Sequence, residues 1–533
     1  MAIYLGLDSS TQSLSAIAIE VQGDQRQVVW QHSLNFDAAL PSYRTRHGVL
    51  PNDDPRIAVS PPAMWAAALD QMMGAFLASD LDESSLAAIA GSAQQHGSVY
   101  LRTDAAARLA ALEYARPLGE QVDGMLSRKV APIWMDSSTS AECAEIAGAM
   151  GGAGRLARLT GSRAFERFTA AQIRRWWKTA PGEYAATGRV HLVSSFLASL
   201  LAGAHAPLDP GDASGMNLMD LSRREWLPDA MAATSPDLAS RLPNIVPSSA
   251  IVGTLSAYWR AKYGLPAARV VAWTGDNPSS LVGTGLVTED RIAVSLGTSD
   301  TVFGLMRAPR VDESGTGHVF ASPTGDYMGL TCFKNGSLAR ERVRDEQRLD
   351  WTGFSAALAK TPPGNGGAMM LPWFEPEITP DVPVPGVHRV NLRPLDPQDA
   401  AANVRAVVEA QMMSMANHSQ WMAAGASMPV RAIHATGGGA ANREVLRVMA
   451  DVFGADVFQF DVGNSACLGA ALRAWHADAL ASGRELPWTE IVRGLAEPAA
   501  ASRISPVSEH VKIYATLRRD YAEFEARFRP SSQ

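Results

Sequence analysis

The sequence predicts an α/β protein built from two domains of related architecture. Its 533 residues exceed the length at which a single hydrophobic core keeps growing. Strand-like apolar runs and capped amphipathic helices recur along the chain. A strand, a polar turn and a second strand occur near the N-terminus and again past the middle, as expected of a duplicated fold with one such hairpin in each domain.

Composition limits the classes of protein to which the chain can belong. Hydrophobic residues make up 47% of the sequence and charged residues 19%, as in ordinary globular proteins, so we expect little disorder. The net charge of −7 argues against a nucleic-acid-binding surface, which needs a basic face. Nucleotide binding stays open, because loop N–H groups and a metal ion can bind phosphates locally.

The lack of a recognisable targeting signal and the pattern of cysteines predict a cytoplasmic protein. The opening residues MAIYLGLDSS lack the basic region of a signal peptide, and the most apolar long window, 192–204, is too short to cross a bilayer. Cys143, Cys332 and Cys467 are scattered and odd in number, so neither a disulfide framework nor a metal cluster is expected. We therefore predict a protein with no membrane and no nucleic-acid partner.

The first repeated motif is the hairpin near the N-terminus. A strand at 3–7 is followed by the polar turn DSSTQS and by a second strand at 14–19. Asp8 then lies at the end of the first strand and Thr11 in the turn. Backbone N–H groups and hydroxyls at such a tip can bind phosphate, but an ordinary β-turn explains this motif alone equally well.

A helix and a buried strand lead to a group of polar residues. Ser60 before two prolines predicts an N-cap and a helix that runs to about Ala78. The strand at 86–90 is followed by GSAQQHGSVY, which places Gln95 and His96 at a strand end. Such groups indicate ligand contact, although a lone histidine is more often structural.

The next segments contribute one candidate ligand residue. Residues 103–130 are polar and uneven, which predicts an excursion at the surface. In IWMDSSTS, Asp136 precedes a helix and can assist its cap. In GSRAFERFT, Arg163 is a candidate for a polyol contact, whereas Glu166 and Arg167 are better explained as an ion pair. The small-residue turn DASGMNLMD is expected to be scaffold.

The central stretch combines a carboxylate with the second hairpin. A strand at 269–273 ends in TGDNP, which leaves the Asp276 carboxylate at the strand's C-terminal end. Two further strands meet at LGTSDT, a tip formed by Gly297, Thr298 and Ser299. A positioned carboxylate and a phosphate-binding turn suit a phosphotransferase. We place the domain boundary near residues 285–290, where a hinge would let two lobes close on a substrate.

A glycine turn follows in the second half of the chain. The strand at 432–435 runs into Thr-Gly-Gly-Gly, which includes Gly437 and Gly438, and a helix starts near Asn442. Glycines let a ring or a phosphate lie directly on the backbone, and the helix N-terminus favours negative charge. This turn is a moderately specific nucleotide signal. The glycine-rich run near residue 364 follows no strand and is not expected to bind nucleotide.

Taken in order, these segments resemble one known family. LGLDSSTQS, QQHGS, WMDSSTS, TGSRAFERFT, TGDNP, SLGTSDT, CFKNGSL and ATGGG are similar to motifs of the FGGY carbohydrate kinases, and most of all to those of the animal-type xylulose kinase subgroup. The resemblance spans nearly the whole chain. It implies a two-domain actin/hexokinase fold of RNase H-like domains with the active site in the interdomain cleft. Residues 1–287 would bind the sugar and residues 288–533 the nucleotide.

The resemblance also implies a role for each matching residue. Asp276 matches the general base, which takes the proton of the sugar's primary hydroxyl as that oxygen attacks the γ-phosphorus of ATP. The other positions divide by ligand. The sugar contacts are matched by Gln95, His96, Arg163 and Asn277, and the phosphate loops by Thr11, Gly297, Thr298 and Ser299. The adenosine site is matched by Trp351, Gly437, Gly438 and Asn442, and the position that orients Mg²⁺, usually through water, by Asp8.

Three positions depart from the usual family pattern. Ser10 stands where the broad family has glycine, and it recurs in the animal-type subgroup; Ser15 and Gln172 stand where lysine is common. The resemblance implies a kinase that uses ATP and Mg²⁺ to convert D-xylulose into D-xylulose 5-phosphate, as a monomer or homodimer. The alternatives are a kinase for another ketose or polyol, such as L-xylulose or ribulose, and a non-catalytic sugar-binding regulator on the same fold.

Overall fold

The chain folds into two compact units. The computed structural model describes residues 1–529 apart from 313–314, 395, 424–425, 427–428 and 461–462. The first unit comprises Met1–Val287, Val319–Tyr327 and Asn464–Ala496, and the second comprises Thr288–His318, Met328–Gly463 and Glu497–Gln533. The expected domain ranges 1–287 and 288–533 therefore need correction, because segments 319–327 and 464–496 pack with the first unit.

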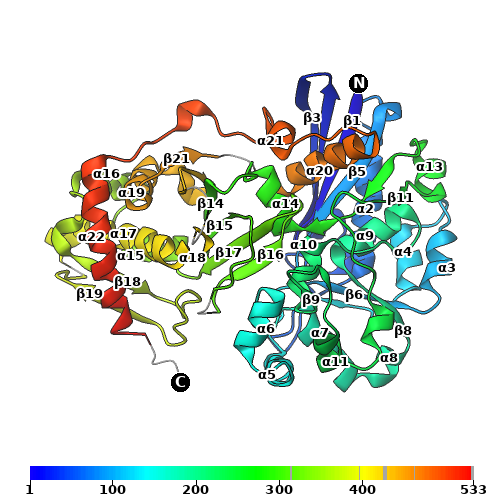
Figure 1. Cartoon of the computed structure of the whole chain (residues 1–533), viewed down its shortest axis with the longest axis horizontal. Coiled ribbons are helices and arrows are strands. Elements are labelled where there is room, and N and C mark those ends of the chain that lie inside the picture. The colour runs from blue at the N-terminus through cyan, green and yellow to red at the C-terminus, as the bar shows by residue number, and fades with distance from the viewer. Residues whose placement is uncertain (313–314, 395, 424–425, 427–428, 461–462, 530–533) are drawn as a thin grey trace. The chain divides into compact units, whose positions relative to one another are not determined.

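The first unit is built on a seven-stranded sheet (Figure 1). Its strand order is β11-β12-β5-β1-β2-β3, and β13 pairs with β5. β1, β2 and β3 form an antiparallel meander, while β5 and β12 run parallel to β1. The strands of this sheet are β1 (Ala2–Ser9), β2 (Ser13–Gln22), β3 (Gln25–Asn35), β5 (Leu86–Ala93), β11 (Ile251–Thr254), β12 (Arg269–Val271) and β13 (Thr274–Gly275).

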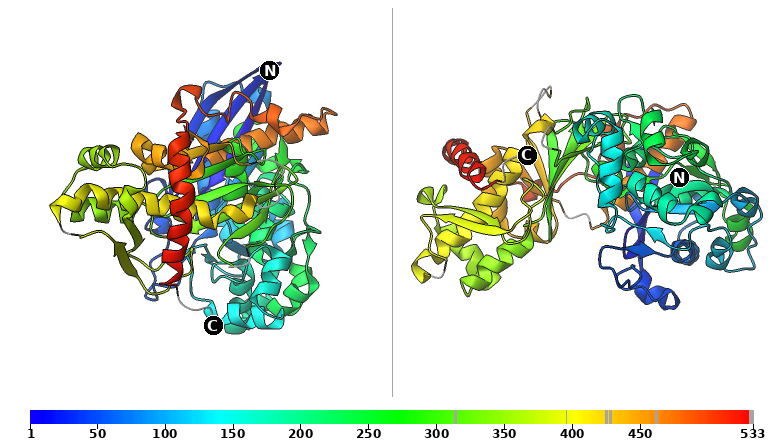
Figure 2. Two further views of the ribbon diagram at one scale, coloured as in Figure 1. Left: turned by 60° about the vertical axis from the view of Figure 1, so that its left-hand side comes forward. Right: turned by 90° about the horizontal axis from the view of Figure 1, so that it is seen from below.

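Alternation along β1 decides which helices cover which face of this sheet. Ile3, Leu5 and Leu7 belong to a core shared with helices α2 (Pro62–Leu77) and α9 (Val193–Ala202). Gly6 points to the opposite face, because side chains alternate along a strand. A Cβ added to Gly6 would lie 2.2 Å from the Cys467 carbonyl of helix α20 (Ser465–Ala481). The small residues of α20 thus let it lie directly on the strands, as Figures 1 and 2 show.

The remaining elements of the first unit are short. Their helices are α1 (Phe36–Ala39), α3 (Ala105–Ala110), α4 (Leu118–Asp123), α5 (Ser140–Ala149), α6 (Ala153–Thr160), α7 (Thr169–Thr179), α8 (Pro181–Ala185), α10 (Pro210–Ala213), α11 (Pro228–Thr234), α12 (Leu238–Arg241), α13 (Ala257–Tyr263), α14 (Asp276–Gly283) and α21 (Trp488–Val492). Their strands are β4 (Val59–Ser60), β6 (Ser98–Arg102), β7 (Ala131–Pro132), β8 (Thr187–Leu192), β9 (Met219–Asp220), β10 (Glu225–Trp226) and β16 (His318–Ala321).

The second unit repeats the strand arrangement of the first. Five strands of a six-stranded sheet fall in this unit, in the order β17-β15-β14-β20-β21; β14 and β15 form an antiparallel hairpin, and β20 and β21 run parallel to β14. This order matches β3-β2-β1-β5-β12, so the predicted duplication is confirmed. The strands of this unit are β14 (Arg291–Leu296), β15 (Asp300–Met306), β17 (Tyr327–Phe333), β18 (Met369–Trp373), β19 (Gly386–Val390), β20 (Ala432–Thr436) and β21 (Asp456–Gln459).

Helix α17 forms the centre of the helical layer in the second unit. It packs against α15, α16, α19 and α22, and Met412, Met413 and Met415 on it are buried in the core. The helices are α15 (Ser337–Glu346), α16 (Trp351–Lys360), α17 (Ala400–His418), α18 (Gln420–Ala423), α19 (Arg443–Phe453) and α22 (Ser508–Ala526).

Two local predictions in the first unit were wrong. Helix α2 begins at Pro62, and Ser60 does not cap it; the Ser60 hydroxyl donates instead to the Gly48 carbonyl at 2.7 Å. Residues 103–130, expected as a surface excursion, include α3 and α4, whose Leu109 and Leu118 are buried in the core. Both errors arose because tertiary packing overrides local propensity.

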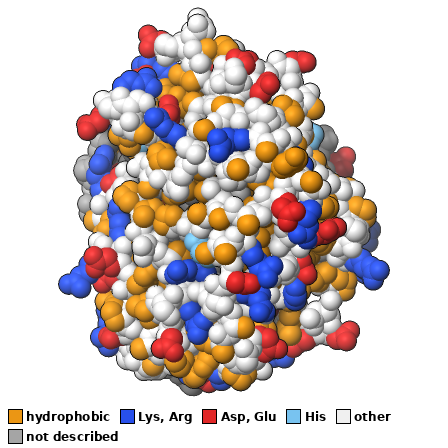
Figure 3. All heavy atoms as spheres, turned by 90° about the vertical axis from the view of Figure 1, so that its right-hand side faces the viewer, with side chains coloured by type: hydrophobic (Ala, Val, Ile, Leu, Met, Phe, Trp, Pro, Cys, Tyr) orange, Lys and Arg blue, Asp and Glu red, His pale blue; other side chains and the backbone are white. Residues whose placement is uncertain are grey.

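Two observations concern the hydropathy of the helices and the charge on one face. Among the described residues, no helix combines the length and the apolar character needed to cross a membrane. On the face drawn in Figure 3, basic and acidic side chains are interspersed rather than gathered by sign. That face therefore offers no basic patch of the kind that nucleic-acid binding requires.

Candidate active site

The turn of the first hairpin is held by side chains on both sides. The Ser10 hydroxyl donates to the Ser13 carbonyl at 3.1 Å and accepts from the Ser13 N–H at 3.2 Å, which closes the loop. Trp134, whose side chain is 45% exposed, donates from Nε1 to Thr11 Oγ1 at 2.8 Å. A Cβ added to Gly48 would lie 1.8 Å from the Thr11 carbonyl oxygen, so the backbone at Gly48 packs directly against the turn.

Asp8 lies beside this turn in a desolvated position. Its Oδ1 accepts a hydrogen bond from Ser92 Oγ of the neighbouring strand β5 at 2.7 Å. Burial raises the pKa of Asp8 to about 6, and the Ser92 hydrogen bond opposes that rise only in part. Among the described residues Asp8 forms no ion pair with lysine or arginine. The carboxylate therefore keeps an uncompensated negative charge.

Asp276 is the first residue of helix α14, directly after the short strand β13. Its Oδ1 accepts from the Asn277 N–H at 2.8 Å. Burial, and after it the negative charge of Asp8, raises the pKa of Asp276 to about 7, while backbone N–H groups of Asn277 and Gln95 oppose the rise. The two strand-end carboxylates predicted separately from the sequence thus form one electrostatically coupled pair.

Gln95 and Asn277 join this carboxylate pair. Asn277 Nδ2 donates to Gln95 Oε1 at 2.9 Å, and a Cβ added to Gly275 would lie 2.4 Å from Gln95 Cγ. Glycine at position 275 is what lets the two strand ends approach so closely. Gln95 Nε2 is buried and has no hydrogen-bond partner among the described residues, which leaves a donor ready for a ligand.

The tautomer of His96 follows from its hydrogen bond. Nδ1 lies 2.7 Å from the Gly215 carbonyl, which can only accept, so Nδ1 carries the proton. Burial, and then the charge of Arg167, lowers the pKa of His96 to about 3, which keeps the ring neutral. Nε2 is therefore an acceptor. His96 has a positive φ of 71° and stacks on Phe168 at 4.2 Å between ring centroids.

Aromatic rings connect Arg163 to this part of the site. The Arg163 guanidinium lies 4.8 Å from the Phe165 ring, and Phe165 lies 5.6 Å from Phe168, which carries His96 on its ring face. Arg167, expected in a plain ion pair, lies 4.9 Å from the same Phe165 ring. The structure thus brings Arg163 into the neighbourhood of His96 through packed rings.

The turn DASGMNLMD, expected as scaffold, positions two of these residues. Gly215 supplies the carbonyl that fixes the His96 tautomer. Asn217 Nδ2 donates to Thr160 Oγ1 and to the Ser162 carbonyl, each at 3.0 Å, and so holds the segment that leads into Arg163. The segment is scaffold in the sense predicted, and its effect is to place sugar-site candidates.

In the second unit, the tip of the other hairpin meets the start of helix α15. The Ser337 N–H donates to the Gly297 carbonyl at 2.8 Å. A Cβ added to Gly336 would lie 2.7 Å from the Thr298 carbonyl and 2.8 Å from the Asp300 N–H nitrogen. Glycine is required at 336 because the helix start lies directly on the hairpin tip. Thr298 is exposed, and Gly297 and Ser299 are half-buried.

A cavity of about 640 Å³ lies next to the glycine turn of this unit. Trp351, Phe354, Ser355, Gly438 and Asn442 line it, so the structure brings three predicted adenosine-site residues together. Trp351 is 44% exposed, meets Phe354 edge-on at 5.4 Å and carries the Arg344 guanidinium 4.5 Å from its ring. An apolar wall beside open backbone suits a planar ring.

The glycine turn uses its residues in different ways. Gly437 has a φ of +81°, and a Cβ there would lie 2.7 Å from the Leu296 carbonyl, so this glycine packs the turn against strand β14. A Cβ on Gly438 would meet open space. Asn442 Oδ1 caps helix α19 by accepting from the Glu444 N–H at 3.0 Å, and its Nδ2 donates to Ser355 Oγ at 2.8 Å. Asn442 thus fixes the wall of the cavity.

The comparisons with known proteins decide the family. Sequence profiles of the FGGY family of carbohydrate kinases match residues 125–283 with the N-terminal domain and residues 292–477 with the C-terminal domain. A xylulose kinase of Mus musculus is 41% identical over 99% of this chain and 95% of its own length. The chain belongs to the FGGY family of carbohydrate kinases. Xylulose kinase 2 of Arabidopsis thaliana is 40% identical to this FGGY kinase over 89% of the chain and 87% of its own length.

A solved structure agrees with the fold. The gluconate kinase of Lactobacillus acidophilus superposes with a TM-score of 0.82 at 18% identity, and the match covers 99% of this FGGY kinase and 98% of the other chain. At that identity the likeness establishes the two-domain α/β fold and leaves the sugar undetermined.

The three departures from the family pattern have local explanations in this FGGY kinase. Ser10 closes the turn of the first hairpin, as described above. Ser15 Oγ pairs with Ser33 Oγ across strands β2 and β3 at 3.1 Å. Gln172 Nε2 donates to Asp136 Oδ1 at 2.8 Å and to the Glu166 carbonyl at 3.1 Å, deep in the fold. Ser15 therefore pairs with an exposed serine on the neighbouring strand, whereas Gln172 satisfies the buried carboxylate of Asp136.

Sequence reasoning missed two features of the site. The sequence assigned no role to Trp134 of IWMDSSTS, yet its indole N–H donates a hydrogen bond to the predicted phosphate-loop residue Thr11. Asp300, in SLGTSDT, forms a buried ion pair with Arg340 of the next helix. A charged residue that follows a phosphate-type turn could have been flagged, but nothing in the sequence selects Arg340 among the nearby arginines as its partner.

Proposed function

We propose that this FGGY kinase transfers the γ-phosphoryl group of ATP to D-xylulose and forms D-xylulose 5-phosphate. The observation that carries the proposal is Asp276, a carboxylate with a pKa raised to about 7 that is hydrogen-bonded among Asn277 and Gln95 and coupled to Asp8. The near-full-length identity to xylulose kinases supports the choice of sugar. The first unit binds the sugar and the second binds the nucleotide.

Asp276 acts as the general base. It accepts the proton of the sugar's primary hydroxyl while that oxygen forms a bond to the γ-phosphorus, and the bond from phosphorus to the bridging oxygen of ADP breaks. A pKa near 7 lets Asp276 be both ionised and basic at neutral pH, because Brønsted behaviour favours a base whose pKa lies near the working pH.

Groups of both polarities in the first unit suit the remaining hydroxyls of a ketopentose. His96 Nε2 accepts, because Nδ1 is committed to Gly215. Gln95 Nε2 donates, and Arg163 adds a charged donor. Asn277 Nδ2 donates to both Gln95 Oε1 and Asp276 Oδ1, which fixes these two side chains relative to each other. A sugar that lacks a hydroxyl at a matched position leaves one of these buried groups unpaired, which disfavours its binding.

The second unit provides the nucleotide contacts. Adenine lies against Trp351 in the cavity next to Gly438, whose wall Asn442 fixes; Gly437 sets the turn itself. The backbone at Gly297–Ser299 binds phosphate oxygens, and in the first unit Thr11 does so. Both tips are strand-turn-strand hairpins with accessible hydroxyls or N–H groups.

Asp8 fits a role in orienting Mg²⁺. The described residues contain no group of three or more side chains that could hold a metal by themselves, so the ion would depend on ATP phosphates and water. The uncompensated carboxylate of Asp8 suits such a hydrated ion. Mg²⁺ would neutralise phosphate charge. We further expect a cytoplasmic monomer or homodimer.

The test is ADP release with Mg·ATP against D-xylulose, L-xylulose, ribulose, ketohexoses, gluconate and glycerol. We expect turnover to be fastest on D-xylulose and to fall on the order of 10²–10⁴-fold in Asp276→Asn, with sugar binding retained by calorimetry. Asp70→Asn is the control, because Asp70 pairs with Lys262 at 2.6 Å in the same unit. Binding without turnover on any sugar would indicate a regulator, and preference for another sugar would leave the mechanism standing.

A further inference from the structure

A buried chain of polar side chains lies behind the second hairpin. It starts at Asp300, the first residue of β15, which is 1% exposed and forms two hydrogen bonds with Arg340 at 2.9 and 3.1 Å. Burial raises the pKa of Asp300, whereas the Arg340 guanidinium and the Gly297 N–H lower it. The same carboxylate therefore pairs with the guanidinium and lies close enough to the Gly297 N–H for that group to lower its pKa.

Arg340 connects the hairpin to the nucleotide cavity. Besides Asp300, it donates to Gln411 Oε1 at 2.8 Å and to Ser337 Oγ at 3.0 Å. It also lines the cavity, and its Nη2 lies 3.3 Å from the place where a Cβ on Gly439 would be. One side chain thus contacts the hairpin, the start of α15 and the edge of the glycine turn.

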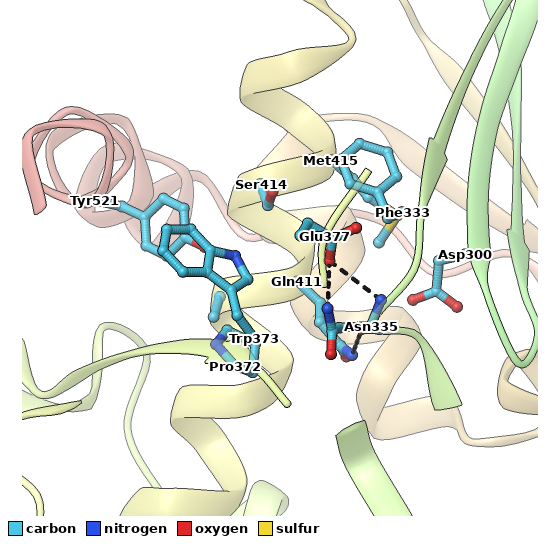
Figure 4. Close-up of a pocket in the computed structure, with 11 residues that line it drawn as sticks. Asp300, Phe333, Asn335, Pro372, Trp373, Glu377, Gln411, Ser414, Met415 and Tyr521 are labelled. Atoms are coloured by element: carbon cyan, nitrogen blue, oxygen red, sulfur yellow. Dashed lines mark hydrogen bonds between the residues drawn. The ribbon is translucent and has the colours of Figure 1, made fainter. Parts of the chain in front are cut away.

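The series of hydrogen-bonded side chains continues to a loop that does not line the cavity. Gln411 Nε2 donates to the Asn335 carbonyl at 2.7 Å and to the Gly336 carbonyl at 2.9 Å. Asn335 Nδ2 donates to Glu377 Oε2 at 2.8 Å, and Glu377 also accepts from the Lys334 and Asn335 N–H groups. Figure 4 shows Gln411, Asn335 and Glu377 meeting from three segments, with Asp300 alongside.

We call five residues the hairpin network: Asp300, Arg340, Gln411, Asn335 and Glu377. All of them except Arg340 line a cavity of about 20 Å³, which has room for one water molecule. Such little free space leaves the network no alternative packing. The network joins four segments around the hairpin tip: strand β15, the start of α15, helix α17 and the loop at 375–378.

Charge gives the network a second effect. A buried carboxylate beside a phosphate-binding tip would repel phosphate, because like charges interact strongly where water is excluded. Arg340 pairs with Asp300 in bidentate geometry and removes that repulsion. Asp300 can then lie beside the hairpin tip without opposing a bound anion.

We propose that the hairpin network is a positioning device for the ATP phosphates: it fixes the Gly297–Ser299 tip against the start of α15 and neutralises Asp300. The proposal rests on the proposed nucleotide site. Glu377 and Asn335 touch neither that cavity nor the tip, so they act through Gln411 and Gly336 as positioning residues.

The experiment measures KM for ATP and for D-xylulose, with kcat, in Glu377→Gln and Asp300→Asn. In Glu377→Gln an amide N–H group replaces one carboxylate oxygen. It then faces N–H groups that donate hydrogen bonds to the carboxylate in the wild type. We expect KM for ATP to rise about tenfold or more in both variants, the cost of one lost buried hydrogen bond to a charged group, with KM for D-xylulose within about twofold.

The matched control is Glu409→Gln. Glu409 is a buried carboxylate on the same helix α17, paired with Arg405 at 2.7 Å and Tyr514 at 2.6 Å, and outside the hairpin network. We expect it to lower the thermal midpoint with KM for ATP unchanged. If the three variants raise KM for ATP equally at equal loss of thermal midpoint, the hairpin network is structural only.

A further variant separates this proposal from the nucleotide site on which it rests. Trp351→Ala removes the expected adenine wall and must raise KM for ATP if that site is correct. If Trp351→Ala leaves KM for ATP unchanged, the assignment of the nucleotide site is wrong, and so is this proposal. An effect in Trp351→Ala with none in Glu377→Gln would overturn the hairpin network alone; should Asp300→Asn fail to fold, Glu377→Gln still decides.

Discussion

Each unit carries one hairpin with an aspartate beside its turn, Asp8 on the strand that enters the first turn and Asp300 on the strand that leaves the second. Both carboxyl groups are desolvated, and burial raises the pKa of each. Their partners differ. Asp8 accepts one hydrogen bond from a serine, whereas Asp300 is neutralised by the bidentate guanidinium of Arg340.

The difference shows how a duplicated backbone can serve two kinds of ligand. Burial raises the pKa of the proposed base Asp276, and the uncompensated charge of Asp8 raises it further; that charge also suits a hydrated cation. Near Asp300 the compensated charge leaves a neutral tip that can bind an anion. The side chains around the turns, and not the turns themselves, set the chemistry of each hairpin.

Removing the charge of Asp8 should break the comparison most severely. We predict that Asp8→Asn lowers kcat on the order of 10²–10³-fold, because the carboxylate that orients Mg²⁺ and sustains the basicity of Asp276 is lost. Steady-state kinetics at saturating ATP and D-xylulose measure the effect, and circular dichroism checks folding. A loss of less than about fivefold would show that the charge of Asp8 is not used.

The pH dependence of kcat/KM tests the same comparison. Below the pKa of the base, kcat/KM should change about tenfold per pH unit. Asp276 is a base only when ionised, and its pKa is raised to about 7, so kcat/KM should rise with pH up to about 7 and then level off. Asp8→Asn removes a negative neighbour and lowers the pKa of Asp276, so the inflection should move to lower pH. An inflection that stays in place in the variant would disprove the coupling.

The smallest expected effect concerns the support of the first turn. Trp134→Phe keeps an aromatic ring and removes the 2.8 Å hydrogen bond to Thr11. Since a hydrogen bond of this kind contributes about 0.5–1.5 kcal/mol, kcat/KM should fall roughly two- to tenfold. Thr11→Ser, which keeps the hydroxyl, is the control and should stay near wild type. An unchanged Trp134→Phe enzyme would show that the turn needs no tether.

Local sequence pattern predicted the elements that depend on nearby residues. The hairpins, the strand-end position of Asp276 and the glycine turn each need only a short apolar run and a turn composition, and the structure contains all of them. The coupling of Asp8 with Asp276 was not predicted, since it joins strands separated by more than half of the chain's length and depends on how they are placed in the sheet.

Features that depend on distant packing escaped the sequence. Nothing in the local sequence indicated that segment 464–496 would lie on the first sheet. The Ser60 hydroxyl was expected to cap a helix, yet it bonds the Gly48 carbonyl, a partner that only the folded chain brings near. The same holds for the hairpin network, whose members come from four segments of the second unit.

The most direct test of the contrast between the two hairpins is the Mg²⁺ concentration that gives half-maximal activity at fixed saturating ATP. It should be measured in wild type, Asp8→Asn and Asp300→Asn. The account predicts that Asp8→Asn shifts this Mg²⁺ concentration upward by about tenfold or more. Asp300→Asn should raise KM for ATP and leave the half-maximal Mg²⁺ concentration near the wild-type value. Equal shifts in both variants, or a shift in Asp300→Asn alone, would contradict the account.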